Sequence, residues 1–337
     1  MRGCAEVGMT ISVCMGIYNG EKYIEKQLDS IYRQTRKADE VILCDDCSTD
    51  GTVEVVRGFI ERNGLRESWK LYCNEENRGY PGNFYYVMGL CTGDVVFPAD
   101  QDDVWAEMKL ERMCAVLELH PEAAAVACKF GLMNGEGEKI HAVMAPTHSL
   151  ETGKLRQVEI REIFYKYQWP GMVLVYRNGW YRERVGLCGG SGHLRQCGQE
   201  SQIPHDILLC AMAAEEGAFF QLDEELAYHR RHESNAAAEE HRMGRLLQKE
   251  RKLWEIEKYL GMLRAFQGGE VLRTEEGKRT LEEKLSTMEG RYGALKSGKM
   301  RAVLRHAFRD RRNVRLATVV CDLVIVWRGK GECGGEE

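Results

Sequence analysis

Acidic residues follow two short apolar runs in this 337-residue sequence, EVILC at 40–44 and DVVFP at 94–98. These residues are Asp45, Asp46, Asp100, Asp102 and Asp103. Brought together, their carboxylates would repel one another unless a cation neutralised them or some were protonated. An all-oxygen set suits Mg²⁺ or Mn²⁺ better than zinc, and a divalent ion that bridges a diphosphate is the expected partner.

Turn and helix-cap roles are the alternative for these aspartates, because Asp is common at both kinds of position. We favour that role for Asp50, which can begin a helix together with Ser48 and Thr49. Asp100 and Asp102 differ, since acids packed directly after a buried strand would be a costly way to make a turn. We therefore predict a metal role for the later pair.

Other phosphate-binding and metal-binding patterns are missing from the sequence. MGIYNG follows the first apolar run where a dinucleotide site would have G-x-G-x-x-G, and neither G-x-x-x-x-G-K-[ST] nor H-E-x-x-H occurs. These absences argue against a dinucleotide oxidoreductase and a P-loop ATPase. His229 and His232 lie three apart, but such a pair is more often structural than a zinc site.

Composition indicates a folded protein of a reducing compartment. The chain is 44% hydrophobic with a net charge of -5, so disorder and a nucleic-acid partner for the main body are not expected. Its 13 cysteines form no regular framework and follow no secretory signal, which predicts a cytoplasmic location. Asp45 and Asp46 separate Cys44 from Cys47 and would raise the thiol pKa values, so we do not expect redox activity.

Apolar runs and helical periods alternate along the first part of the chain. The predicted strands are 10–15, 40–44, 69–73, 94–98 and 123–130, and the predicted helices between them include 24–34, 83–90 and 106–119. This alternation predicts an α/β fold, with a mostly parallel sheet covered by helices on both faces. In such a sheet, ligands bind beyond the carboxyl ends of the strands, where the acidic residues fall.

A helical extension follows at 237–337. One apolar stripe is formed by Leu246, Leu253, Ile256, Leu260 and Leu263, and Gly268-Gly269 breaks the period. In 301–327 arginines come first and an apolar stretch follows, which suits either an anionic membrane surface or a helix docked on the protein. No apolar run reaches the ~18–20 residues that a membrane span needs, so a peripheral contact is the membrane alternative.

Several motifs resemble those of family 2 glycosyltransferases, close to the rhamnosyltransferase-like branch. They are ISVCMGIYNGEKYIEKQLDSI at 11–31, DEVILCDDCSTDGT at 39–52, NRGYPGNF at 77–84, GDVVFPADQDDVWAEMKL at 93–110, HDILLCAMAAEEG at 205–217 and YHRRHESN at 228–235. The resemblance implies a Rossmann-like GT-A fold for residues 1–236, with a nucleotide-sugar half at about 10–130 and an acceptor-side half at 131–236.

The resemblance also implies roles for individual residues. For the donor it implies Tyr18 stacked on the nucleotide base, Asp46 bonded to the base edge, Asp100 at the ribose and metal, and Arg78 nearby. For the metal it implies Asp100, Asp102 and His232, with Asp103 assisting. For the acceptor it implies Asp206 as catalytic base, and the N-cap of a helix at 207–213 is an alternative or additional role for this residue. Trp169 and Gly171 fall in an acceptor-side segment, where Trp169 suits either a sugar-stacking role or the core.

The predicted function is inverting transfer of a sugar from a nucleoside diphosphate sugar, either a UDP-sugar or dTDP-rhamnose, with Mg²⁺ or Mn²⁺ as cofactor. The expected acceptor is a hydroxyl of a glycan or lipid-linked saccharide in cell-surface polysaccharide biosynthesis. A sugar-1-phosphate nucleotidyltransferase is one alternative, although it needs a glycine-rich basic loop that we do not find. A non-catalytic nucleotide-sugar-binding module is the other, and the presence of Asp102 and Asp206 speaks against it.

Overall fold

The computed structural model of the chain describes residues 8–140, 153–166, 168–185, 203–232 and 248–331. These residues fall into two compact units. The first combines Met1–Glu159 with Gln168–Arg231, and the second combines Ile160–Tyr167 with His232–Glu337.

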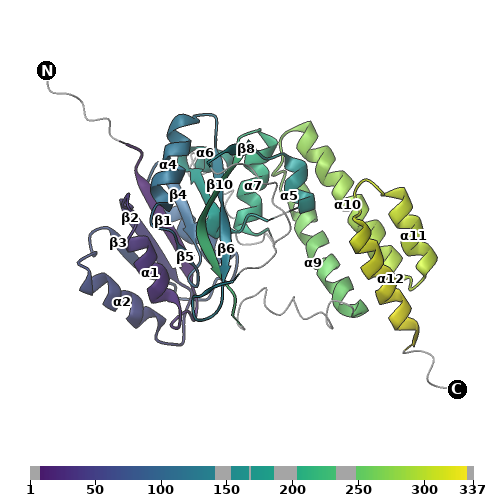
Figure 1. Cartoon of the computed structure of the whole chain (residues 1–337), viewed down its shortest axis with the longest axis horizontal. Helices are drawn as coiled ribbons and strands as arrows, with labels where there is room; N and C mark the ends of the chain where they lie inside the picture. The colour runs from purple at the N-terminus through teal and green to yellow at the C-terminus, as the bar shows by residue number, and fades with distance from the viewer. Residues whose placement is uncertain (1–7, 141–152, 167, 186–202, 233–247, 332–337) are drawn as a thin grey trace. The chain divides into compact units, whose positions relative to one another are not determined.

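The first unit is built on one ten-stranded sheet within the described residues (Figure 1). Its strands are β1 (Ile11–Ile17), β2 (Glu40–Asp45), β3 (Trp69–Cys73), β4 (Val95–Ala99), β5 (Val104–Trp105), β6 (Ala125–Met133), β7 (Lys139–Ile140), β8 (Leu155–Gln157), β9 (Leu174–Arg177) and β10 (Phe219–Arg230). The strand order is β3-β2-β1-β4-β9-β6-β10-β5, with β7 paired to β6 and β8 to β10.

The β3-β2-β1-β4 part of the sheet is parallel, as the alternating pattern predicts. β9 runs antiparallel to both β4 and β6, while β6 and β10 pair in parallel. The sheet is therefore mixed beyond β4, and the parallel half is the part that gathers strand ends at one edge.

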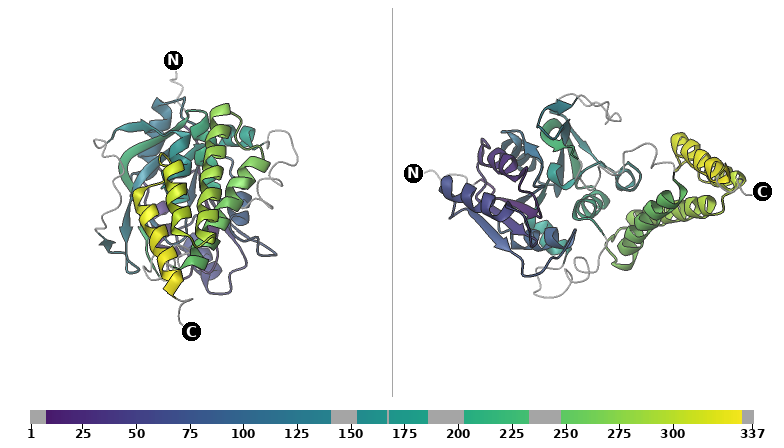
Figure 2. Two further views of the ribbon diagram at one scale, coloured as in Figure 1. Left: turned by 90° about the vertical axis from the view of Figure 1, so that its right-hand side faces the viewer. Right: turned by 90° about the horizontal axis from the view of Figure 1, so that it is seen from below.

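Helices cover both faces of this sheet (Figure 2). They are α1 (Ile24–Tyr32), α2 (Thr52–Arg62), α3 (Gly82–Leu90), α4 (Lys109–Leu119), α6 (Asn178–Arg184) and α7 (His205–Glu215). In β1, Val13, Cys14 and Met15 are all 0% exposed although their side chains alternate between the two faces. The continuous apolar run of β1 is thus the run expected of a strand buried on both sides.

The second unit is helical. Its helices are α5 (Ile160–Lys166), α9 (Lys249–Gly268), α10 (Glu275–Lys296), α11 (Met300–Arg309) and α12 (Leu316–Gly331). Ile256, Leu260 and Leu263 of the predicted stripe are buried, and α9 packs on α10. The predicted break falls at Gly269, where α9 ends, and residues 237–247 lie outside the described ranges. Thr274 begins α10 because its side chain accepts a hydrogen bond from Gly277 N–H (3.0 Å).

Helices able to cross a membrane are missing from the described part of the chain: none is both long enough and apolar enough. The nine cysteines within that part are free thiols.

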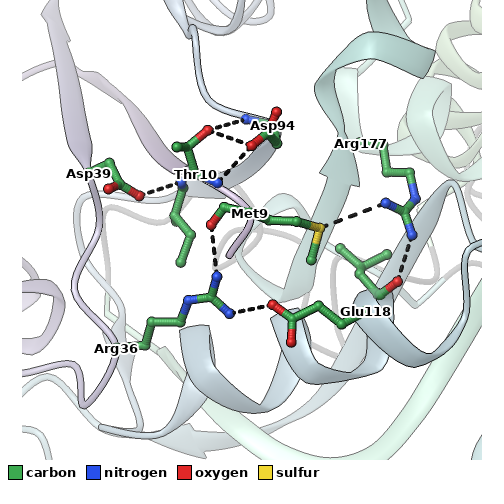
Figure 3. Close-up of polar contacts among 9 residues, drawn as sticks. Met9, Thr10, Arg36, Asp39, Asp94, Glu118 and Arg177 are labelled. Atoms are coloured by element: carbon green, nitrogen blue, oxygen red, sulfur yellow. Dashed lines mark hydrogen bonds and ion pairs between the residues drawn. The ribbon is translucent and has the colours of Figure 1, made fainter. Parts of the chain in front are cut away.

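Polar contacts fix the beginning of β1 (Figure 3). The Asp94 carboxylate accepts hydrogen bonds from the N–H (2.8 Å) and hydroxyl (2.7 Å) of Thr10, and Asp39 accepts one from Ile11 N–H (2.8 Å). Arg36 donates to the Met9 carbonyl (2.8 Å) and pairs with Glu118 (2.8 Å). The first strand is thereby bonded to the segments before β2 and β4, which sets its register.

We predict that Asp94→Ala lowers the free energy of unfolding by about 1 kcal/mol at neutral pH. The Thr10 N–H and hydroxyl lower the pKa of Asp94, so its contribution is present above the unfolded pKa and is lost as pH falls through the folded pKa. Urea unfolding at neutral and acidic pH tests this, with Glu61→Ala as a surface-acid control. An equal wild-type-to-variant difference at both pH values would contradict it.

Candidate active site

The loops that follow β1 and β4 are bonded to each other at the carboxyl edge of the sheet. Gln101 accepts a hydrogen bond from Tyr18 N–H (2.9 Å), and its amide donates one to the Tyr18 carbonyl (2.9 Å). Gly20 lies so close to the Gln101 side chain that a Cβ at this position would clash with it. These bonds hold the Tyr18 backbone while 49% of the residue surface stays exposed, so its ring is available to a ligand.

The loop after β2 joins the same edge through Asn19. Asn19 N–H donates to the Ser48 hydroxyl (2.9 Å), and the Asn19 side-chain oxygen accepts from Thr49 N–H (2.8 Å). Asn19 has a φ of 47°, a left-handed conformation that Asn adopts more readily than most residues. Three strand ends are therefore linked before any ligand binds.

Asp46 is buried, and its carboxylate organises the loop that follows β3. One carboxylate oxygen accepts from Arg78 N–H (2.8 Å) and Asn74 Nδ2 (2.8 Å), and the other from Gly79 N–H (2.8 Å). Arg78 itself donates to the Asn74 side chain (3.2 Å) and lies 4.1 Å from the centroid of the Tyr86 ring. The sequence missed this loop-holding function, and the contact of Asp46 with a base edge stays a prediction.

Asp100 lies directly after β4 and is partly exposed. Burial raises the pKa of its carboxyl, and so do the carboxylates of Asp103, Asp102 and Asp206, while His229 opposes them. Asp206 comes from α7, more than a hundred residues later in the sequence. The predicted donor residue and the predicted base are thus within electrostatic reach of each other.

Asp103 differs from its neighbours because it is fully buried and paired within the protein. It accepts hydrogen bonds from His229 Nδ1 (3.1 Å) and Arg230 N–H (3.0 Å), both in β10. Burial lowers the pKa of His229, but the hydrogen bond to Asp103 and the charges of Asp103, Asp100 and Asp102 raise it more. One carboxylate oxygen of Asp103 is therefore bonded to β10, while its Oδ2 has no hydrogen-bond partner in the described part of the chain, and metal assistance by Asp103 stays a prediction.

Tyr80 is a further residue of this site that the sequence did not single out. Although 63% of the residue is exposed, the pKa of its phenol is raised by partial burial and by the carboxylates of Asp206 and Asp100. It lies in the loop that Asp46 holds, within the motif NRGYPGNF. The sequence signal that could have identified Tyr80 was an aromatic residue in a glycine- and proline-rich loop after a predicted strand.

Asp206 lies in the first turn of α7 and is half-buried. The helix begins at His205 with Pro204 as N-cap, so the alternative that Asp206 caps this helix is wrong. Its carboxylate accepts a hydrogen bond from Ile207 N–H (2.8 Å). An acidic side chain in the first turn is favoured by the helix dipole, which fixes Asp206 without using it as the cap.

The segment with Trp169 and Gly171 packs beside α7. Trp169 is 1% exposed and meets Phe219 edge to face at 5.5 Å, so it is a core residue and cannot stack on an acceptor sugar. A Cβ on Gly171 would lie 2.5 Å from His205 Nε2, and His205 stacks on Phe84 at 4.1 Å. Gly171 thus leaves room for the histidine beside Asp206.

A ready-made metal cage is not formed by the described residues: no group of three or more His, Cys, Asp or Glu side chains among them could hold an ion. His232, just beyond the end of β10, is half-buried. Burial raises the pKa of Asp100 most and the charges of Asp103, Asp102 and Asp206 raise it further, and a nearby cation would favour its ionised form. Mg²⁺ commonly binds through one or two carboxylates plus substrate phosphates, so Asp100 and Asp102 fit an ion that a diphosphate helps to hold.

We predict that Gly171→Ala destabilises the protein by about 1–3 kcal/mol, because the added Cβ displaces His205 from a packed position. Gly179→Ala is the matched control, since no atom lies within 4 Å of a Cβ added there. Urea unfolding of the two variants measures the difference. Equal stability of both variants would mean that His205 moves aside without cost, and that its close approach to Gly171 does not constrain this position.

We predict that Asp103→Asn lowers the pKa of His229, because the variant lacks the carboxylate that stabilises the imidazolium. In the wild type this pair stabilises the fold below the unfolded histidine pKa and loses that effect as pH rises through the raised folded pKa. An NMR titration of the His229 ring protons reports the value, with Asp29→Asn, a substitution of a half-buried carboxylate that pairs with Arg33, as control. An unchanged titration midpoint would refute the pairing.

Known proteins share both the sequence motifs and the fold of this chain. Residues 12–178 match the model of Glycosyl transferase family 2. EpsE of Bacillus subtilis (strain 168), provisionally named a glycosyltransferase, is 36% identical to this chain over 113 residues. That match covers 34% of this chain and 40% of EpsE, so the chain spans less than half the length of this relative.

Two solved structures share the fold over nearly the whole chain. The crystal structure of Staphylococcus aureus TarS 1-349 in complex with UDP-GlcNAc has a TM-score of 0.56 at 19% identity, covering 96% of this chain and 92% of that one. Mannosyltransferase PcManGT from Pyrobaculum calidifontis, in complex with GDP-Man and Mn²⁺, has a TM-score of 0.53 at 17% identity, covering 98% and 89%. The first unit therefore has the expected GT-A fold, and the chain carries a domain of glycosyltransferase family 2.

Proposed function

We propose that this chain is an inverting, metal-dependent glycosyltransferase. It transfers a sugar from a nucleoside diphosphate sugar to a hydroxyl group of a glycan or a lipid-linked saccharide. The observation that carries the proposal is that Asp206 adjoins His205, whose ring meets Tyr80 at 6.0 Å, and that its charge raises the pKa of Asp100, because a base and a donor-binding carboxylate must face one space for transfer. Family membership supports the reaction class.

The donor side of the proposal uses the loops at the carboxyl edge. The exposed Tyr18 ring is the stacking surface for the base, and Asp46 with the loop of Arg78 forms the polar side of the pocket. The two fold neighbours are complexes with UDP-GlcNAc and with GDP-Man, which supports a nucleoside diphosphate sugar as ligand class. The nucleotide that binds will decide between a UDP-sugar and dTDP-rhamnose.

Asp206 acts as the general base on the acceptor side. Its carboxylate takes the proton of the acceptor hydroxyl as that oxygen forms a bond to the anomeric carbon. The bond between the anomeric carbon and the diphosphate oxygen breaks, and the nucleoside diphosphate leaves from the opposite face, which inverts the configuration. The Ile207 N–H bond helps to keep the carboxylate oriented for this step.

The metal site is proposed at Asp100 and Asp102. When bound, a divalent cation supplies positive charge to the departing diphosphate. The PcManGT complex contains Mn²⁺, which supports this choice of cofactor. No observation favours the nucleotidyltransferase alternative, and the binding-module alternative is decided by the same experiment as the proposal.

We predict that Asp206→Asn keeps donor binding but loses roughly 10²- to 10⁴-fold in turnover. Asp102→Asn should lose metal-dependent donor binding instead. A thermal-shift panel of UDP, dTDP and GDP sugars, with and without Mn²⁺, measures binding, and release of nucleoside diphosphate from the bound donor with water as acceptor measures turnover. Asp29→Asn, which changes a half-buried carboxylate on α1, is the control for both.

The outcomes separate the two parts of the proposal. Donor binding with no turnover in the wild type would favour the binding module. A thermal shift that is equal with and without Mn²⁺, and unchanged in Asp102→Asn, would refute the metal site but leave the base assignment to be decided by Asp206→Asn.

A further inference from the structure

Two adjacent helices of the second unit each expose a stripe of large apolar side chains. On α11 the stripe is Met300, Leu304 and Phe308, exposed by 37%, 51% and 76%. On α12 it is Leu316, Val320 and Trp327, exposed by 79%, 51% and 66%. Side chains of this size are normally buried, so two such stripes on neighbouring helices require an explanation.

Each stripe lies on the outer side of its helix. Val303 and His306 are the buried residues of α11, and Asp322, Ile325 and Val326 are the buried side chains of α12. At helical spacing, these positions fall on the side opposite the exposed stripes. Figure 2 (left) shows α11 and α12 side by side, in agreement with their contacts. The tail is therefore packed on one side and apolar on the other.

Arginines flank both stripes in the sequence and are exposed, although Arg309 pairs with Asp310 and Arg315 donates to the Tyr165 carbonyl (3.5 Å). The arginines are Arg301, Arg305, Arg309, Arg311, Arg312, Arg315 and Arg328. The segment 299–328 contains only two acidic residues, Asp310 and Asp322. Asp310 pairs with His306 (2.9 Å) and Arg309 (3.2 Å), and the buried Asp322 pairs with Arg291 (2.8 Å). The outer surface thus combines apolar side chains with an excess of positive charge.

From this combination we infer that the outer surfaces of α11 and α12 dock on an anionic lipid bilayer. The apolar stripes enter the boundary between headgroups and acyl chains, and the long arginine side chains extend to lipid phosphates. None of the described helices can span a bilayer, so the two helices lie in the plane of the surface. The inference goes beyond the proposed function, because no residue of the stripes belongs to the first unit.

A second copy of the chain is the main competing partner for an apolar surface. A symmetric dimer through this surface would bring the same patch of both copies together. Arginines would then face arginines with no free carboxylate on α11 or α12 to neutralise them, which costs free energy in a desolvated contact. Charge complementarity therefore favours an anionic bilayer over self-association.

Flotation of the full chain with lipid vesicles tests the inference. Vesicles of phosphatidylcholine mixed with phosphatidylglycerol should bind the wild type, whereas vesicles of phosphatidylcholine alone should bind much less. Leu304→Ser/Phe308→Ser should weaken binding roughly tenfold or more, because it removes apolar contact with the acyl region. Arg301→Gln/Arg305→Gln/Arg312→Gln should also weaken it roughly tenfold or more and reduce its salt dependence.

Matched controls lie on the first unit. Leu119→Ser removes a side chain that is 78% exposed on α4, and Arg66→Gln removes an exposed arginine. Both should bind vesicles as the wild type does, and circular dichroism should show unchanged helix content in all variants.

Three results would overturn the inference. One is absence of wild-type binding to anionic vesicles. Another is unchanged binding of the Leu304→Ser/Phe308→Ser variant. The third is a wild-type dimer in light scattering that this variant converts to a monomer while vesicles bind neither form, which would assign the surface to a second copy.

Discussion

The concentration of negative charge at the carboxyl edge of the sheet is the constraint on which the first unit depends. Three other carboxylates raise the pKa of Asp100, and positively charged or hydrogen-bonding groups lie near this acidic cluster on two sides. β10 supplies His229 and the Arg230 N–H to Asp103. Lys109 is fully buried and donates a hydrogen bond to the Met172 carbonyl. Its Nζ lies 3.9 Å from the centroid of the Trp105 ring, and burial lowers its pKa to about 8. Burial disfavours the charge on Lys109, whereas the charges of Cys128, Asp103 and Asp100 favour it, so the acidic edge helps this buried lysine to stay charged.

The parallel half of the fold was predictable because its signal is local. The runs at 40–44 and 69–73 became β2 and β3 almost unchanged. β2 is a continuous apolar run buried on both faces, whereas β3 is an edge strand in which only Trp69 is buried. The helix predicted at 106–119 begins only at Lys109, because Val104–Trp105 pair with β10 as β5. That pairing joins residues more than a hundred positions apart, and no local pattern reports it. The antiparallel insertion of β9 was missed for the same reason.

The candidate site shows the same difference between residues that local patterns locate and residues that distant contacts bring in. Tyr18, Asp46 and Asp100 follow strands that the sequence locates, so their common edge was predictable. His229 joins the site through Asp103, and Tyr80 through Asp206 and Asp100, all of which are distant in sequence from their partners or lie on other elements. Trp169 is a core residue because it packs against Phe219. In the tail, the structure supports the docked-helix alternative for one side of α11 and α12, and membrane contact of the other side stays a proposal. The sequence allowed either a docked helix or a surface helix, whereas α11 and α12 are buried along one side and exposed along the other.

The loop after β3 is held by its backbone, and this has an evolutionary consequence. Asp46 bonds the N–H groups of Arg78 and Gly79, groups that every residue except proline provides. These backbone bonds form whatever side chains positions 78 and 80 carry, although the Arg78 side chain adds its contacts with Asn74 and Tyr86. Substitutions at these two positions can remodel the wall of the pocket without refolding it. A lineage carrying this framework could thus diversify its choice of ligand through a few point changes.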